Sequence, residues 1–272
     1  EGYEAARKVF AQHQDSRGLA DTYHALGLLS LHEGDSAEAL RLLRRAVDMH
    51  RQLASGLAHG KVLYDLAVAA SERREYVLAL DSATKGLEIF DREQYRVGVS
   101  QCLGLVARVL LNQHRPAEAR PFFERALRIR EDLGDRRGVG EAVAALADIA
   151  LVLDQPDRAL ELARRAREIY GQVGEFVGAA SALRTMGVAE SAMRRFESAL
   201  AHLRDAVATY RGLGRKDAQL CVILESLADC QEQMSLVKDA RDSLGDALAV
   251  AKELQLGHQI GHLEARLRAS LH

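Results

Sequence analysis

Apolar side chains recur three or four positions apart along most of this chain, and this spacing predicts amphipathic helices rather than strands. Residues 135–174 give the clearest example. Asp135 can cap a first helix, Pro156 can occupy the first position of a second helix, and Gly174 can end that helix. The apolar face of the first helix is made by Val139, Val143, Leu146, Ile149, Ala150 and Leu153. The chain is therefore predicted to be all-α.

A signature of small residues repeats along the chain at a fixed step. The pair Leu146-Ala147 is followed twelve positions later by Ala159 and seven positions after that by Ala166. Such a fixed period predicts a repeat array, in which each unit packs on its neighbours. The step is forty residues four times and forty-one once, because the other copies begin at Leu26, Leu66, Val106, Met186 and Leu227.

This period organises residues 1–272 as a single solenoid of about fourteen helices. Because the chain begins within a repeat, we expect it to be a fragment of a longer protein. The predicted half-repeat, six full repeats and capping helix span 1–14, 15–54, 55–94, 95–134, 135–174, 175–214, 215–255 and 257–271.

Four positions carry specific structural expectations. Phe10 is expected to be exposed on the open face of the half-repeat. In the final helix, Leu263 is expected to be buried against the sixth repeat, while Arg266 faces water. Pro121 lies within the second helix of the third repeat, where it is expected to bend that helix or delay its start.

Composition and charge narrow the classes of function. Hydrophobic residues make up 48% and charged residues 28%, which is typical of a soluble globular chain. The net charge of −2 leaves no surplus of positive charge for phosphates, so nucleic-acid contact is not expected. The sequence has no apolar run long enough to span a membrane, and we expect neither a transmembrane helix nor a signal peptide. Cys102, Cys221 and Cys230 are odd in number, which favours free buried thiols in a reducing cytoplasm.

The spacing of the signature resembles the tetratricopeptide repeat across essentially the whole chain. Two features differ from that family's commonest form: the repeat has forty residues instead of thirty-four, and the closing proline is absent. These departures are similar to a subclass that includes the sensor domain of the bacterial maltose-regulon activator, other nucleotide-binding bacterial signalling regulators, and kinesin light chain. The positions of the missing proline hold Arg51, Asp91, Glu131, Gly171, Arg211 and Lys252.

The resemblance implies a right-handed superhelix of antiparallel helix pairs, whose first helices line a concave groove for peptides, proteins or small effectors. Such modules are not enzymes. Lys61 has no asparagine partner at the matching places, which disfavours carboxylate clamping of chaperone tails. The family's groove positions fall here on His24, Lys61, Tyr64, Asp65, Gln101, Arg108, Asn112, Asp148, Arg184, Thr185, Glu225 and Asp229, and also on Val68 and Leu105.

Several of these positions have two interpretations. Arg108, Asp148 and Arg184 lie at similar places on consecutive first helices, where they either grip a peptide or acidic ligand or form an inter-repeat ion-pair ladder. Tyr64 and His24 are either binding hot spots or side chains packed between helices.

Charged clusters outside that set also have alternative interpretations. Glu225, Asp229 and Glu232 form an acidic ridge that either receives a basic partner segment or is simply solvated. His258 and His262 have a zinc-compatible spacing, but nothing nearby completes a site, so no metal and no cofactor is expected. Interleaved acidic residues make ordinary solubility the favoured explanation for second-helix arginines such as Arg41, Arg44, Arg45, Arg125, Arg128, Arg130, Arg164, Arg165 and Arg167.

These observations favour a non-enzymatic protein- or peptide-binding scaffold in the cytoplasm. We expect it to be a regulatory or interaction segment of a larger bacterial signalling or transcription-regulating protein. The partner is a protein, a peptide or a covalently linked upstream domain, without direct nucleic-acid or membrane contact. A small-molecule effector sensor and a self-association module, with a homodimer, remain as alternatives. Repeat folds carry many functions, so the partner is not named by the sequence.

Overall fold

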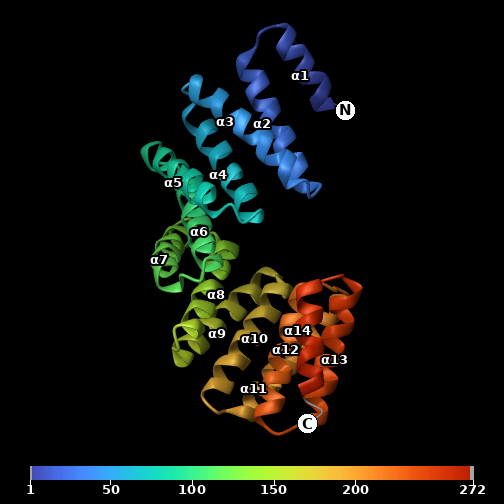
Figure 1. Ribbon diagram of the computed structural model, residues 1–272. Helices are drawn as coiled ribbons and strands as arrows, with labels where there is room; N and C mark the ends of the chain where they lie inside the picture. Colours follow the sequence, from blue (N-terminus) through green and yellow to red (C-terminus); the bar gives the residue numbers. More distant parts are fainter. Residues whose placement is uncertain (1, 270–272) are drawn as a thin grey trace. The chain divides into compact units, whose positions relative to one another are not determined.

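The computed structural model describes residues 2–269, apart from the side chains of Glu4 and Arg7. In this range the chain forms fourteen helices and no strand, which confirms the predicted all-α solenoid class (Figure 1). Residues 270 and 271 of the predicted capping helix lie outside the described residues. The helices are α1 (Gly2–Gln12), α2 (Ser16–His32), α3 (Ser36–Gln52), α4 (Gly56–Glu72), α5 (Tyr76–Arg92), α6 (Arg96–Asn112), α7 (Pro116–Asp132), α8 (Arg136–Val152), α9 (Pro156–Val173), α10 (Phe176–Ala192), α11 (Phe196–Gly212), α12 (Ala218–Gln233), α13 (Val237–Glu253) and α14 (Gly257–Ala269).

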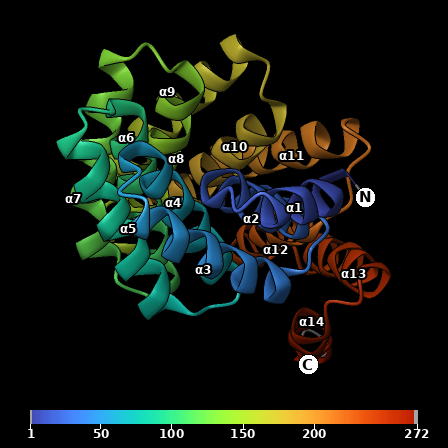
Figure 2. The ribbon, with the colours of Figure 1, turned by 90° about the horizontal axis from the view of Figure 1, so that it is seen from above.

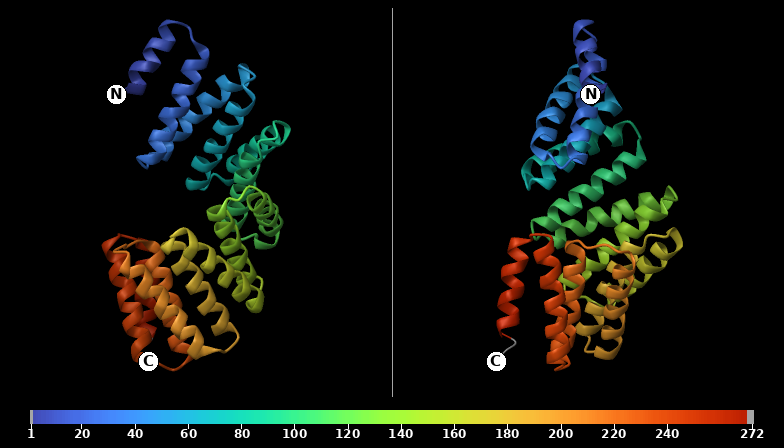
Figure 3. Two further views of the ribbon diagram at one scale, coloured as in Figure 1. Left: turned by 180° about the vertical axis from the view of Figure 1, so that it is seen from behind. Right: turned by 90° about the vertical axis from the view of Figure 1, so that its right-hand side faces the viewer.

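The chain divides between Gly134 and Asp135 into two compact units, the first with α1 to α7 and the second with α8 to α14. Within each unit every helix packs on the next one along the chain. Alternate helices also touch, as α2 does with α4, α4 with α6, α8 with α10, and α10 with α12. This is the stacking expected of helix pairs in a repeat protein (Figure 3). The single-domain organisation over the whole chain stays a prediction.

The turns between helices share one backbone conformation. Each contains a residue with positive φ, and these residues lie twenty positions apart, with one step of twenty-one. In most of these turns the next residue donates its N–H to a carbonyl five positions back, as Asp35 does to Ser30 and Glu75 to Ala70, both at 2.8 Å. This arrangement satisfies carbonyl groups at the end of each helix. The positive-φ residues are Gln14, Gly34, Ala54, Arg74, Gln94, His114, Gly134, Asp154, Gly174, Arg194, Gly214, Ser235 and Gln255.

The local signals in the fourth repeat are confirmed. The Asp135 side chain accepts the N–H of Gly138 at 2.9 Å, Pro156 opens α9, and Gly174 ends α9 with φ of +71°. Leu263 is fully buried, as expected.

Two other expectations require correction. Phe10 is half-buried rather than exposed, because its ring packs on Gly18, where a Cβ would lie 2.6 Å from it. The side chain of Arg266 does not face water, since only 22% of it is exposed beside α12. For Pro121 one of two alternatives is excluded: helix α7 begins at Pro116 and runs through Pro121, so its start is not delayed, and the bend stays a prediction.

The small residues of the signature lie where helices approach most closely. Ala159 and Ala166 are completely buried in the second unit. A Cβ on Gly187 of α10 would lie only 2.5 Å from Cγ of Leu203 in α11. A Cβ on Gly27 would likewise lie 2.7 Å from Cγ of Leu43. Glycine in the Leu-Gly pair therefore leaves room for a large side chain from the second helix of the same pair.

Candidate functional site

A cavity of about 740 Å³ lies between α4, the turn after it and α6, in the first unit. Four of its lining residues are predicted groove positions. Val68 and Leu105 supply apolar surface, and Arg108 and Asn112 supply polar groups. The remaining lining residues are Ser71, Glu72, Arg74, Tyr76, Leu111 and His114. A concave surface with apolar walls and a few polar groups is the usual form of a ligand site.

Arg108 and Asn112 are one turn apart on α6, so both project from the same face of the helix. Both side chains are exposed, and among the described residues neither has a hydrogen-bond or ion-pair partner. A guanidinium group without a carboxylate partner is available for an anion or for a peptide carbonyl. The cavity therefore presents a free cation and a free amide against an apolar wall.

Tyr64, Lys61 and Gln101 lie on the same two helices as the cavity but are not among its lining residues. Tyr64 packs partly buried against a core cluster that includes Cys102, and burial raises the pKa of its phenol. The Lys61 ammonium lies 5.9 Å from the centre of the Tyr95 ring. The Gln101 side chain is exposed.

The polar residues on the other first helices mostly bond to each other. In the first unit, Nε2 of His24 lies 2.6 Å from Oδ2 of Asp65, which joins α2 to α4. In the second unit, Nη2 of Arg184 lies 3.1 Å from Oδ1 of Asp148, and the hydroxyl of Thr185 donates to that same oxygen at 2.8 Å. Arg184 and Asp148 thus pair across consecutive repeats, as the ladder interpretation describes for these two residues, whereas among the described residues Arg108 takes no part in such a pair.

The acidic ridge on α12 is covered by the chain itself. Nη2 of Arg266 in α14 lies 2.7 Å from Oδ1 of Asp229 and 3.0 Å from Oε2 of Glu232. Nε2 of His262 lies 3.5 Å from Oε2 of Glu225. Helix α14 also packs beside α13, as Figures 2 and 3 both show. Helix α14, the last described helix, thus supplies the side chains that contact the acidic ridge.

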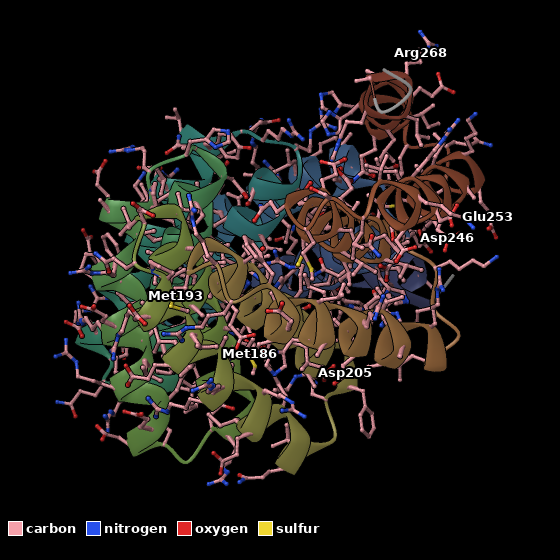
Figure 4. All side chains as sticks on the ribbon, turned by 90° about the horizontal axis from the view of Figure 1, so that it is seen from below. Met186, Met193, Asp205, Asp246, Glu253 and Arg268 are labelled. Atoms are coloured by element: carbon pink, nitrogen blue, oxygen red, sulfur yellow. The ribbon has the colours of Figure 1, made fainter. Side chains whose placement is uncertain are left out.

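Ion pairs likewise neutralise the charges along α13. Nη2 of Arg211 lies 2.5 Å from Oδ2 of Asp246, and Nζ of Lys216 lies 2.8 Å from Oε2 of Glu253. Figure 4 labels the two acidic residues, which both lie on α13. Exposed pairs of this kind contribute little stability, but they leave few free charges on this surface.

The sequence interpretation missed two kinds of residue. The cavity residues Arg74, Tyr76 and His114 come from turns and a second helix, whereas the groove map considered first helices only. It also missed the carboxylate of Glu190, which is buried and lies 2.7 Å from Nδ1 of His202. The sequence did contain a signal for Glu190, because this acidic residue occupies the position that the apolar Ala150 holds one repeat earlier.

Within residues 2–269, no group of three or more His, Cys, Asp or Glu side chains is placed to hold a metal ion. In the same range, no helix combines the length and apolar character needed to cross a bilayer.

Comparison with known families finds two models described as tetratricopeptide repeat. One matches residues 99–172, and the other matches residues 19–55 and 179–213, so together they match more than half of the chain. No curated protein matches the chain significantly.

Solved structures show the same fold at low sequence identity. A Rap protein complexed with Competence and Sporulation Factor is 15% identical, with a TM-score of 0.65, covering 94% of this chain and 75% of that one. The apo form of the quorum sensor NprR from B. thuringiensis is 13% identical, with a TM-score of 0.69 and coverage of 99% and 81%. A signal transduction ATPase with a tetratricopeptide repeat sensor from Pyrococcus horikoshii is 16% identical, with a TM-score of 0.71 and coverage of 96% and 42%.

Proposed function

The chain belongs to the tetratricopeptide repeat family, and on this premise we propose that it is a non-enzymatic scaffold that binds a peptide or protein segment in the α4–α6 cavity. The observation that carries the proposal is the pair Arg108 and Asn112, which are free on the wall of a 740 Å³ cavity at predicted groove positions. An asparagine amide can both donate to and accept from a peptide backbone, and an arginine binds a carboxylate or carbonyl oxygen. Val68 offers apolar surface for a side chain of the partner, and the almost fully buried Leu105 lies behind it in the lining.

The other predicted groove residues support this location by their own contacts. His24 is bonded to Asp65, and Arg184 is bonded to Asp148. A partner that used them would first have to break these bonds, which offsets part of what it gains. Arg108 requires no such exchange.

We further propose that the chain has a regulatory role. Two of the structural relatives are described as a quorum sensor and as a signal transduction ATPase with a repeat sensor, and a Rap protein was solved with a bound factor. On this basis we place the chain as the interaction segment of a larger bacterial signalling or transcription-regulating protein. A small-molecule sensor and a self-association module are the alternatives that its test must separate.

The proposal is tested by selecting peptides from a random library against the full chain. Affinities of selected peptides are then measured by fluorescence polarisation. Arg108→Ala and Asn112→Ala are each expected to weaken binding by roughly tenfold, the loss typical of an interface hot spot. Arg167→Ala is the matched control, since Arg167 is an exposed arginine of the second unit that lies outside the cavity.

Peptides that bind all three variants as tightly as the unaltered chain would contradict the cavity as the site. If no peptide is selected, a thermal-shift screen of metabolites tests the sensor alternative, because a ligand that binds only the folded state raises the melting temperature. Light scattering of the chain over a concentration series tests self-association.

A further inference from the structure

A second cavity of the first unit, of about 650 Å³, is lined by four arginines from two consecutive repeats. Arg41, Arg44 and Arg45 come from α3, and Arg73 comes from the turn between α4 and α5. We call it the arginine cavity. It shares no residue with the α4–α6 cavity and is therefore a separate site from the proposed peptide site.

The arginine cavity carries a surplus of positive charge. Only two of its lining residues are acidic, Asp48 and Glu75. A single carboxylate, that of Glu75, is shared by Nη2 of Arg44 at 3.2 Å and Nε of Arg73 at 3.3 Å. Asp48 is paired at 3.0 Å with Arg51, and Nε of Arg41 donates to Oε2 of Glu38 at 2.7 Å; neither Arg51 nor Glu38 is part of the lining.

Arg45 adds a cation that no carboxylate neutralises. Its side chain is exposed, and in the described part of the chain it has no ion-pair or hydrogen-bond partner. A free guanidinium group beside a carboxylate shared by two others makes the cavity attractive to a further anion.

The repeats themselves provide an internal comparison for these four positions. If arginine were needed there to stack one repeat on the next, other repeats would keep it. No other repeat keeps all four: each matching set retains one or two basic residues, while proline, alanine or acidic residues take other places without interrupting the helix pairs, so only the complete set of four arginines is specific to this junction. The matching sets, forty residues apart with one step of forty-one, are Asp81, Thr84, Lys85 and Gln113; Pro121, Glu124, Arg125 and Leu153; Glu161, Arg164, Arg165 and Met193; and Ala201, Arg204, Asp205 and Met234.

We propose that the arginine cavity binds a compact phosphate-bearing ligand. The planar guanidinium fork donates two parallel hydrogen bonds and matches the geometry of phosphate oxygens. Ligand cavities commonly have volumes of about 300–1,000 Å³, and the volume here falls in that range. Free polyphosphate and the phosphates of a nucleotide share this chemistry.

The test is isothermal titration calorimetry of the full chain with inorganic pyrophosphate at low ionic strength. We expect saturable binding at one site, weakened roughly tenfold by Arg45→Ala and by Arg73→Ala. Glu75→Gln should strengthen binding several-fold, because it removes the carboxylate that occupies Arg44 and Arg73. Arg125→Ala is the matched control, since Arg125 holds the position of Arg45 two repeats later, and it should leave binding unchanged. Circular dichroism establishes that each variant is folded.

The same titration with ADP identifies the source of the phosphate. ADP that binds much more tightly than pyrophosphate indicates a nucleotide, and equal affinity indicates that phosphate alone is held; either result supports the site. The proposal is overturned if pyrophosphate shows no saturable binding, or if Arg125→Ala weakens binding as much as Arg45→Ala. It is also overturned if a hexaglutamate peptide binds while pyrophosphate does not.

Discussion

Replacing Gly187 by alanine is expected to destabilise the second unit, although alanine favours a helix. Gly187 lies in the interior of α10, and a Cβ at this position would be 2.5 Å from Cγ of Leu203 and 3.0 Å from the carbonyl oxygen of Ala199. Leu203 is completely buried, so its side chain has little room to move aside. The carbonyl belongs to the backbone of α11 and cannot rotate away.

Two opposing effects set the magnitude. Alanine gains about 1 kcal/mol over glycine in a helix interior. Overpacking a close contact costs about 1–3 kcal/mol, and the backbone contact favours the upper part of that range. We therefore expect Gly187→Ala to lower the free energy of unfolding by about 1–2 kcal/mol.

Gly245→Ala provides the control for helix propensity in the same unit. Gly245 lies within α13, and a Cβ there would meet nothing within 4 Å. This substitution should raise the free energy of unfolding by about 0.5–1 kcal/mol. In a Leu203→Ala background, where the large side chain is gone, the cost of Gly187→Ala should fall to a fraction of its original value.

The assay is urea unfolding followed by far-ultraviolet circular dichroism, with midpoints compared among the four variants and the unaltered chain. If Gly187→Ala is as stable as the unaltered chain, the close approach of α10 and α11 is not a constraint and the reasoning fails. It also fails if the Leu203→Ala background leaves the cost of Gly187→Ala undiminished, because the leucine would then not be its cause.

Three further predictions follow from other contacts. Asp148→Asn should lower the free energy of unfolding by about 1–2 kcal/mol, because Arg184 loses its charged partner and the buried Thr185 hydroxyl loses a charged acceptor; an unchanged urea midpoint would argue against this. Ala54→Gly should raise the free energy of unfolding by about 0.5–1 kcal/mol, because glycine relieves the backbone strain at this position, where φ is +47°. Equal urea midpoints for the variant and the unaltered chain would contradict this prediction. Burial raises the pKa of Cys102 from 9.0 to about 12. The unfolded thiol therefore ionises first, and this residue's stabilising contribution is present below pH 9.0 and declines as the pH rises toward 12. Mass spectrometry should find Cys102 unalkylated by iodoacetamide in the folded protein, and rapid labelling would refute this.

Local chemistry made part of the fold predictable. Asp135, Pro156 and Gly174 each act on backbone groups within a few residues, so their capping and turn roles followed from sequence alone. The fixed forty-residue step likewise gave the class of stacked helix pairs. The half-buried state of Phe10 was missed because its neighbour Gly18 lies beyond the turn, where packing rather than helix periodicity decides exposure.

The candidate site was predictable only as a set of helix faces. The groove map placed Arg108 and Asn112 on one face of α6, because residues four apart share a helix face, and both residues line the cavity. It could not supply Arg74 and His114, which reach the cavity from turns, or Tyr76, which reaches it from the start of α5. Nor could it tell that Arg108 is free while other positions are bonded.

By itself, the sequence determined the helices, their caps and the repeat, since these depend on contacts between residues close together along the chain. Only the tertiary structure decided which charges are neutralised and which remain free. Asp148 meets Arg184 thirty-six residues away, and Arg266 meets Asp229 thirty-seven residues away, so both pairs depend on how neighbouring repeats pack. The same packing brings Arg73 beside the arginines of α3 and leaves Arg108 open on the wall of its cavity.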